Sequence, residues 1–294
     1  MVFGVNGVAI DVVDRHDSGV DQQSSDIVDY YTSRYREDGR LDARPQARLE
    51  RTRTMELLRV LLPCPPARVL DVGGGTGEYA RALVAGGHQV RLIDLVPSHV
   101  AQAASGQPPV DAVVADARAL PEYDDHYDAT LLLGPLYHLV HREDRLTALR
   151  EAVRVTRPGG RVIAAAISRF AGPIDFAATG RLTEGAIREA RALLTNGVND
   201  PSSNFTPAYF HRAEELIDEC RASGLTDVVV HGLEGPAWTA AEAAADGPLA
   251  EVVFTDALDL ARVYTSEPAL IAASAHLLAT GLVPETDKQR QQIR

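Results

Sequence analysis

The stretch RVLDVGGGTGEYA, residues 68–80, joins an aliphatic run with an acid to four glycines within five positions, and then to a helix-forming segment. Glycine lacks a Cβ and adopts positive φ readily, so this composition predicts a tight turn between a strand and a helix. The backbone of such a turn can approach a ligand closely. The glycines of the predicted turn are Gly73, Gly74, Gly75 and Gly77.

Strand and helix patterns alternate on both sides of this turn. The strand patterns cover seven segments: 67–73, 88–95, 110–121, 127–134, 161–168, 226–233 and 273–282. Helix patterns lie between them, at 77–86, after Pro97, and at 142–156, 212–223 and 249–265. Short connections between such elements indicate a parallel sheet with right-handed crossovers. We therefore predict an α/β fold with a Rossmann-like, doubly wound sheet of seven strands, the last of them antiparallel.

Four segments lie outside the strand–helix repeat. Residues 1–25 are predicted to be a flexible extension, since they lack the basic and apolar parts of a signal peptide and end in Asp, Ser and Gln. Residues 26–62 carry helical spacing and are predicted to form an N-terminal helical cap. Residues 169–210 interrupt the repeat after the fifth strand and are predicted to be an inserted lid. Residues 285–294 form a polar tail, so the main domain covers 26–284.

Composition limits the partners. The chain has 29 Lys and Arg against 41 Asp and Glu, a formal net charge of −12, which repels a polyanion such as nucleic acid. No apolar run approaches the roughly 18 residues that span a membrane. Cys64 and Cys220 form no CxxC pair, and no His or Cys cluster has metal-ligand spacing. We predict a cytoplasmic monomer or homodimer that binds no metal, no nucleic acid and no membrane.

The glycine turn admits two kinds of ligand. A dinucleotide-binding turn has the pattern G-x-G-x-x-G, whose third glycine packs the helix against the strand. Gly73 and Gly75 fit this pattern, but Glu78 occupies the third position and Gly77 falls one residue early. An acidic side chain there would also face a pyrophosphate unfavourably at a helix N-terminus. The pattern therefore favours a ligand without phosphate, such as S-adenosylmethionine.

Three aspartates follow successive predicted strands. Asp71 ends the first strand and suits a cationic amino-acid group, and Asp94 ends the second and can accept both hydroxyls of a ribose. Asp116 follows the third strand and can accept an adenine amino group, with the Ala117 amide beside the ring. Ligands of doubly wound sheets sit beyond the carboxyl ends of the strands. Each aspartate alone is an ordinary loop or cap residue, but together with the glycines they indicate one binding rim.

Five segments, in order, resemble the motifs of class I S-adenosylmethionine-dependent methyltransferases. Within residues 68–167 they read VLDVGGGTGEYA, VRLIDLVP, ADARALP, YDATLLLGPLYHL and REAVRVTRPGGRVI. Shorter segments extend the likeness towards residues 28–284 and resemble a bacterial subgroup of small-molecule methyltransferases: YY, RLE, SRFAG, YFHRAEEL, GLEGPAW and SAHLLATG. The resemblance implies that residues 26–284 form a methyltransferase domain with S-adenosylmethionine as cofactor.

The resemblance also implies roles for single residues around the cofactor. Asp71, Gly73 and Gly75 would line its methionine part, and Leu133 would present its backbone near the sulfonium. Asp94 would bind the ribose, and Asp116 and Ala117 would bind the adenine. Tyr31 and Arg40 of the predicted cap would close over the cofactor carboxylate, a role for which Arg48 and Arg53 are equally available.

Methyl transfer requires a nucleophile held about 3 Å from the activated carbon, with water excluded. A base helps when that nucleophile is a hydroxyl or a protonated amine, and histidine titrates in the right range. His138 follows the fourth predicted strand and His211 follows the predicted lid, so both are catalytic candidates. Tyr137, Tyr209 and Trp238 are predicted to line the substrate.

These patterns predict a methyltransferase acting on an oxygen or nitrogen of a small-molecule metabolite, secondary metabolites included. The segment GPLYH lacks the Asn or Asp before Pro-Pro-Tyr or Pro-Pro-Phe that DNA amino-methyltransferases carry. Neither cysteine is placed for C5 chemistry on a pyrimidine. Three alternatives stay open: a protein or tRNA methyltransferase, a dinucleotide-dependent oxidoreductase, and a protein that binds the cofactor without catalysis.

Overall fold

The computed structural model describes three stretches of the chain, residues 22–33, 39–199 and 206–285. Most of the predicted extension and nearly all of the predicted tail lie outside these stretches, as do residues 200–205 of the predicted lid. The first helix, α1 (Gln22–Ser33), begins within the segment predicted as the extension.

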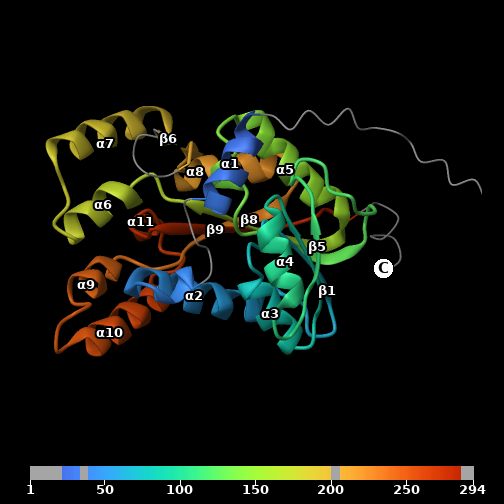
Figure 1. Cartoon of the computed structure of the whole chain (residues 1–294), viewed down its shortest axis with the longest axis horizontal. Helices are drawn as coiled ribbons and strands as arrows, with labels where there is room; N and C mark the ends of the chain where they lie inside the picture. Colours follow the sequence, from blue (N-terminus) through green and yellow to red (C-terminus); the bar gives the residue numbers. More distant parts are fainter. Residues whose placement is uncertain (1–21, 34–38, 200–205, 286–294) are drawn as a thin grey trace, which may run out of the picture.

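A seven-stranded sheet forms the centre of the molecule (Figure 1). In spatial order its strands are β3 (Asp111–Val114), β2 (Gln89–Asp94), β1 (Arg68–Val72), β4 (Tyr127–Leu132), β5 (Thr156–Ile167), β9 (His276–Leu282) and β8 (Thr226–Gly232). The strand pairs are parallel except those of β9, which runs antiparallel to both β5 and β8. The predicted Rossmann-like, doubly wound sheet with an antiparallel last strand is confirmed.

Helices cover both faces of this sheet (Figure 1). Side chains alternate along β1, so that Leu70 and Val72 belong to one apolar cluster and Val69 to the other. The first cluster is completed by α5 (Arg142–Val155) and α8 (Ala213–Ala222). The second is completed by three helices, α2 (Pro45–Leu61), α3 (Glu78–Ala85) and α4 (Pro97–Ser105). Burial of strand residues on both faces explains the continuous apolar runs of the central strands.

The segment predicted as a lid contains its own small elements. They are α6 (Ala171–Ala178), α7 (Glu184–Asn196) and the antiparallel pair β6 (Val198–Asn199) and β7 (Ala208–Tyr209). Three helices separate β8 from β9: α9 (Trp238–Ala243), α10 (Ala250–Val263) and α11 (Pro268–Ile271). The sequence pattern predicts only the long helix α10 among these three.

The fifth strand starts earlier than its apolar pattern indicates. It begins at Thr156, directly after α5, and includes the segment Arg157–Gly160 that the pattern assigns to a stop signal. The pairing of β4 with β5 shifts register between Tyr127 and Ala129, so the extra residues form a bulge. The helix α5 therefore ends close to the predicted position, and Gly159 and Gly160 lie in the bulge of β5.

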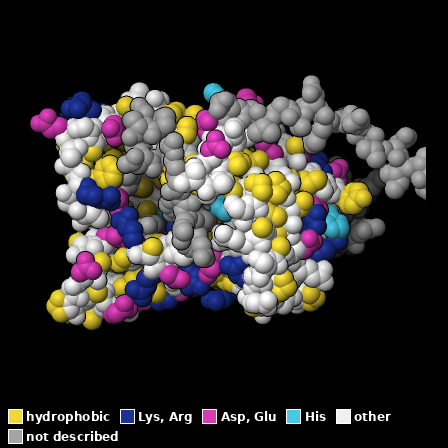
Figure 2. Space-filling model, in the orientation of Figure 1, with side chains coloured by type: hydrophobic (Ala, Val, Ile, Leu, Met, Phe, Trp, Pro, Cys, Tyr) yellow, Lys and Arg dark blue, Asp and Glu magenta, His cyan; other side chains and the backbone are white. Residues whose placement is uncertain are grey.

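The surface mixes charges of both signs. On the face drawn in Figure 2, Arg side chains lie among Asp and Glu side chains. Many of them form ion pairs; Arg44, for example, contacts both Asp175 and Glu242. Among the described residues, the helices are too short or too polar to cross a membrane.

Candidate functional site

The glycine turn connects β1 to α3, as predicted. Gly73, Gly75 and Gly77 have positive φ values of 71°, 56° and 86°. A Cβ placed on Gly73 would lie 2.6 Å from Cδ of Pro135, a distance that real atoms do not adopt. A larger residue therefore fits neither the backbone conformation nor the space at Gly73.

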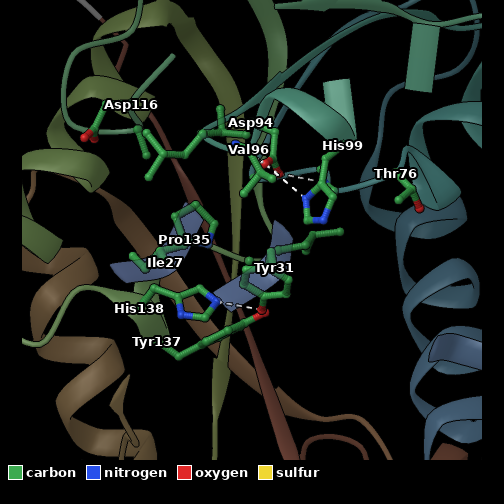
Figure 3. A pocket seen from close by; sticks show the side chains of 18 of the residues that line it. Ile27, Tyr31, Thr76, Asp94, Val96, His99, Asp116, Pro135, Tyr137 and His138 are labelled. Atoms are coloured by element: carbon green, nitrogen blue, oxygen red, sulfur yellow. Dashed lines mark hydrogen bonds and ion pairs between the residues drawn. The ribbon is translucent and has the colours of Figure 1, made fainter. Parts of the chain in front are cut away.

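A cavity lies beyond the carboxyl ends of β1, β2 and β4, against this turn (Figure 3). Its empty space, including the opening to solvent, is about 1220 Å³. Residues of α1 and of the short helix η1 (Arg40–Asp42) form its outer wall. Ten of the predicted site residues line it: Tyr31, Arg40, Gly73, Gly75, Asp94, Asp116, Ala117, Leu133, Tyr137 and His138.

Asp94 holds the second strand end against the glycine turn. One carboxylate oxygen accepts the Gly75 N–H at 2.8 Å, and the other accepts the Val96 N–H at 2.9 Å. The second oxygen also lies 3.3 Å from Nδ1 of His99. Because each carboxylate oxygen has two acceptor positions, Asp94 can still accept hydroxyl groups from a ligand.

Asp116, which the sequence predicts to accept the adenine amino group, lies beside Arg118. The Arg118 guanidinium lies 2.7 Å from one Asp116 oxygen and 3.0 Å from the other. The same guanidinium donates to the Ser24 hydroxyl of α1 at 2.9 Å. This pair therefore fixes the Asp116 carboxylate and connects α1 to the end of β3.

Asp71 lies beneath the turn rather than among the residues that line the cavity. It is fully buried, and its two carboxyl oxygens have no hydrogen-bond partner among the described residues. One of these oxygens lies 2.7 Å from the position that a Cβ on Gly74 would take. Burial, helped by the nearby charge of Asp94, raises the pKa of Asp71 to about 7.

His138 belongs to the short helix η2 (Leu136–His138) after β4. Its Nε2 lies 3.0 Å from the Tyr31 hydroxyl (Figure 3). Its Nδ1 lies 3.0 Å from the Thr206 hydroxyl. Burial lowers the pKa of His138 to about 4, against the opposing effect of Asp94. The imidazole is therefore neutral at physiological pH, and both of its nitrogens face hydroxyl groups.

A second cavity continues from the first. The two share five lining residues, Tyr31, Arg40, Tyr79, Leu133 and Tyr137. The second is completed by six more: Glu50, Thr54, Ala165, Ile167, Leu233 and His276. Leu133, at the end of β4, thus lies where the two cavities meet.

Charged groups are concentrated in the second cavity. The Arg40 guanidinium donates to both Glu50 oxygens, at 2.9 and 3.0 Å. Burial favours the neutral acid, but Arg40 and His276 together lower the pKa of Glu50 to about 2. Atoms of Glu50, Glu234 and His276 that could ligate a metal lie within 4.8 Å of one another, a grouping that the sequence spacing does not indicate.

Besides Asp71, three predicted site residues lie outside both cavities. His211 is fully buried and its Nε2 lies 3.1 Å from Glu219. Tyr209 packs under the Arg145 guanidinium, 3.7 Å from the ring centre. Trp238 is buried in a separate apolar cluster and its Nε1 donates to the Ala273 carbonyl at 2.9 Å. Aromatic side chains often fill core space in this way.

Comparison with known proteins bears on what this site binds. Residues 69–160 match the family described as "Methyltransferase domain". Those residues run from β1 into β5 and include the glycine turn, Asp94, Asp116 and His138. Residues 69–160 are therefore similar to methyltransferase domains, and the sheet that contains them has the Rossmann-like fold of such domains. Such a domain uses S-adenosylmethionine as its cofactor.

This chain aligns with only part of the length of a curated relative. The demethylmenaquinone methyltransferase of Renibacterium salmoninarum is 30% identical over 152 residues, which are 52% of this chain and 60% of that protein. This chain thus spans less than two thirds of that relative.

Two solved structures share the fold. The S-adenosylmethionine-dependent methyltransferase of Mesorhizobium loti is 18% identical with a TM-score of 0.52, covering 80% of this chain and 99% of the other. Phosphoethanolamine N-methyltransferase 2 of Haemonchus contortus, solved with S-adenosyl-L-methionine, is 16% identical with a TM-score of 0.55, covering 91% and 61%.

This region has the local features that S-adenosylmethionine requires. Gly73 packs so closely against Pro135 that only a residue without a Cβ fits there, and Asp94 lines the same cavity with acceptor positions left for a ligand. Asp71 is buried beneath the turn and does not line this cavity. The glycine turn and Asp94 therefore fit the cofactor.

The sequence does not indicate Glu50 and His276 of the second cavity, or Glu234, which contacts His276. Glu50, Glu234 and His276 lie far apart along the chain and show no common motif. The sequence indicates these three residues only indirectly, because each residue lies in one of the short segments that extend the resemblance: RLE, GLEGPAW and SAHLLATG.

Proposed function

We propose that this protein is a methyltransferase that transfers a methyl group from S-adenosylmethionine to an oxygen or nitrogen of a small-molecule metabolite. The observation that carries the proposal is the pair of adjoining cavities that meet at Leu133 and Tyr137. The first has the features of a cofactor site, and the second offers an acceptor a space of its own. An acceptor there would lie next to the end of β4, where the resemblance puts the sulfonium.

The polar character of the second cavity supports an acceptor with exchangeable protons. Glu50, Arg40, Thr54 and His276 line it, and all four can hydrogen-bond to a hydroxyl or an amine. Mixed charge on the face of Figure 2 and the net charge of −12 favour a small molecule over a nucleic acid. We keep a cytoplasmic location and a monomer or homodimer as predictions.

Methylation of a quinol carbon is a second candidate. Its support is the printed name of the Renibacterium salmoninarum relative, a demethylmenaquinone methyltransferase. The charged lining of the second cavity favours the first candidate, because a quinone ring and its apolar chain would leave Glu50 and Arg40 without new partners.

Calorimetry with S-adenosylhomocysteine tests the cofactor site. Gly73→Ala places a methyl group against Pro135, so we expect affinity at least tenfold lower, about 1.4 kcal/mol. Gly180→Ala is the matched control, since Gly180 also has positive φ, 68°, but meets no atom within 4 Å and lies outside the cavity. Its affinity should equal that of the wild type. A wild type that does not bind the ligand would contradict the proposal.

A second experiment identifies the acceptor. The wild type is incubated with methyl-labelled S-adenosylmethionine and a library of phenols, amines and quinols, and products are assigned by mass spectrometry and NMR. Label on oxygen or nitrogen supports the first candidate, and label on a quinol carbon supports the second. Binding of the cofactor with no labelled product in the library or in a filtered cell extract would indicate a non-catalytic protein.

A further inference from the structure

The antiparallel course of β9 brings its first residue to the ligand-binding edge of the sheet. His276 pairs with Ile167, the last residue of β5, and both line the second cavity. Glu234 follows the end of β8, at Gly232, on the neighbouring strand. Residues from two late segments of the chain therefore meet at the edge where the parallel strands end.

Glu234 fixes the orientation of the His276 ring. One Glu234 oxygen accepts the Nδ1–H of His276 at 2.6 Å, and the other accepts the backbone N–H of the same residue at 2.9 Å. Gln46 donates its amide to the first of these oxygens at 2.8 Å. Glu234 is fully buried, so these hydrogen bonds are not exchanged with solvent. Because the carboxylate only accepts, the proton of the neutral ring is held on Nδ1 and the lone pair is on Nε2.

The Nε2 atom is accessible from the second cavity. It has no hydrogen-bond partner among the described residues. Unlike the Tyr79 hydroxyl, it is not buried away from the surrounding space. The Tyr79 hydroxyl is buried and is not accessible from the cavity, although Tyr79 lines both cavities. The cavity therefore offers an acceptor one basic nitrogen, Nε2 of His276.

The charges around His276 suit a ring that takes up a proton. Glu234 and Glu50 face it, with a Glu50 oxygen 3.6 Å from Nδ1, and Arg40 is the one described cation paired with this group. Two carboxylates and one guanidinium leave one negative charge, which an imidazolium neutralises. Burial lowers the pKa of His276, but Glu50 and Glu234 outweigh both burial and Arg40, and the pKa is raised above its ordinary value.

We infer that His276, oriented by Glu234, is the general base for an acceptor hydroxyl or amine bound in the second cavity; this inference rests on the proposed function. The acceptor lone pair forms the bond to the methyl carbon while the carbon–sulfur bond breaks and its electron pair stays on sulfur. The acceptor proton passes to Nε2 of His276 and from there to solvent. Glu234 is a positioning residue, because it acts only through the ring.

NMR of the imidazole nitrogens tests the arrangement without an acceptor. In the wild type bound to S-adenosylhomocysteine, we expect the neutral His276 ring to carry its proton on Nδ1, with a bare Nε2. Glu234→Gln should lower the pKa of His276 and populate both tautomers. A neutral ring protonated on Nε2 in the wild type would overturn the inference.

Kinetics test the chemical role. His276→Asn keeps a side-chain N–H for Glu234 but removes the basic nitrogen, so we expect methyl transfer to a mixture of phenols and primary amines to fall at least 100-fold. Affinity for S-adenosylhomocysteine should stay within twofold. The matched control is His231→Asn on β8, whose ring contacts Ser266 and lies outside both cavities. It should keep the wild-type rate.

The pH dependence separates a base from a structural residue. A base must be unprotonated, so the rate should rise with pH through the raised pKa of His276, and Glu234→Gln should move this rise to lower pH. Equal rates in His276→Asn and the wild type would overturn the inference. So would loss of activity in EDTA with recovery in zinc, since Glu50, Glu234 and His276 would then hold a metal. Failure of the wild type to bind S-adenosylhomocysteine would instead overturn the proposed function.

Discussion

At the scale of single residues, Asp71 couples the glycine turn to pH. Its pKa in the folded protein is about 7, against 3.8 for an exposed carboxyl. Between these two pH values the folded state binds the proton and the unfolded chain does not. The contribution of Asp71 to the free energy of unfolding therefore falls as pH rises from about 4 to 7 and is level above that range.

Asp71→Asn should remove this pH dependence. Relative to the wild type, the variant should gain stability of about 2 kcal/mol between pH 5 and pH 8, because the wild type must then bury an unpaired carboxylate. Urea unfolding of both proteins at the two pH values measures the difference. Asp256→Asn, on the exposed side of α10, removes one charge without burial and serves as the control. An equal pH dependence in Asp71→Asn and the wild type would mean that Asp71 ionises normally.

At the scale of elements, one buried arginine joins α5, α8 and the chain after η2. The Arg145 guanidinium lies 2.7 Å from Glu219 and donates to the carbonyls of Leu139 and Val140 at 2.9 and 2.8 Å. Its side chain is 2% exposed and that of Glu219 4%. Burial opposes ionisation, but His211 and Arg145 together lower the pKa of Glu219 to about 2. The network holds the segment that carries His138 against the sheet.

Arg145→Met should destabilise the protein by about 3–5 kcal/mol, because it leaves the Glu219 carboxylate buried without its main partner. The double variant Arg145→Met with Glu219→Met should cost less than the single one, since no charge is then left behind. Urea unfolding at pH 7 compares the three proteins. A double variant that is less stable than Arg145→Met would show that hydrogen bonding to Glu219, rather than its charge, is the main contribution.

The helices and strands differ in how well the sequence predicts them. Apolar runs predict β1, β2 and β4, because helices bury these strands on both faces of the sheet. The bulge in β5 is hidden, since Pro158 and two glycines have the composition of a turn. The sequence pattern also fails to predict the short helix α9, because Trp238 is buried by tertiary contacts that no local pattern indicates.

The same distinction applies to the site. The residues predicted to bind the cofactor follow successive strands, so strand order alone predicts that Asp94 and Asp116 lie together. Glu50 and His276 meet only because β9 is inserted between β5 and β8 and because α2 lies against that edge. Such a contact depends on the complete fold, and a single sequence does not reveal it. The resemblance included both residues without indicating a role for either.

At the scale of the whole molecule, α1 forms a wall of the cofactor cavity while lying outside the apolar clusters. Gln23 donates to the His138 carbonyl, and the Tyr31 hydroxyl lies 3.0 Å from the His138 ring. Ile27 and Ser24 also line the cavity. The residues of the four apolar clusters all come from segments after α1. The helix therefore contributes to the cavity more than to the core.

A variant that lacks residues 1–33 should keep a cooperative thermal transition, because its apolar clusters are complete. It should bind S-adenosylhomocysteine at least tenfold more weakly, since Tyr31, Ile27 and the other wall residues of α1 are gone and the cavity is open on that side. A variant that lacks only residues 1–21 keeps α1 and should bind as the wild type does. Calorimetry on the three proteins measures the affinities. If the two truncations bind equally well, α1 does not contribute to the cofactor site, and η1 and the glycine turn form it without help.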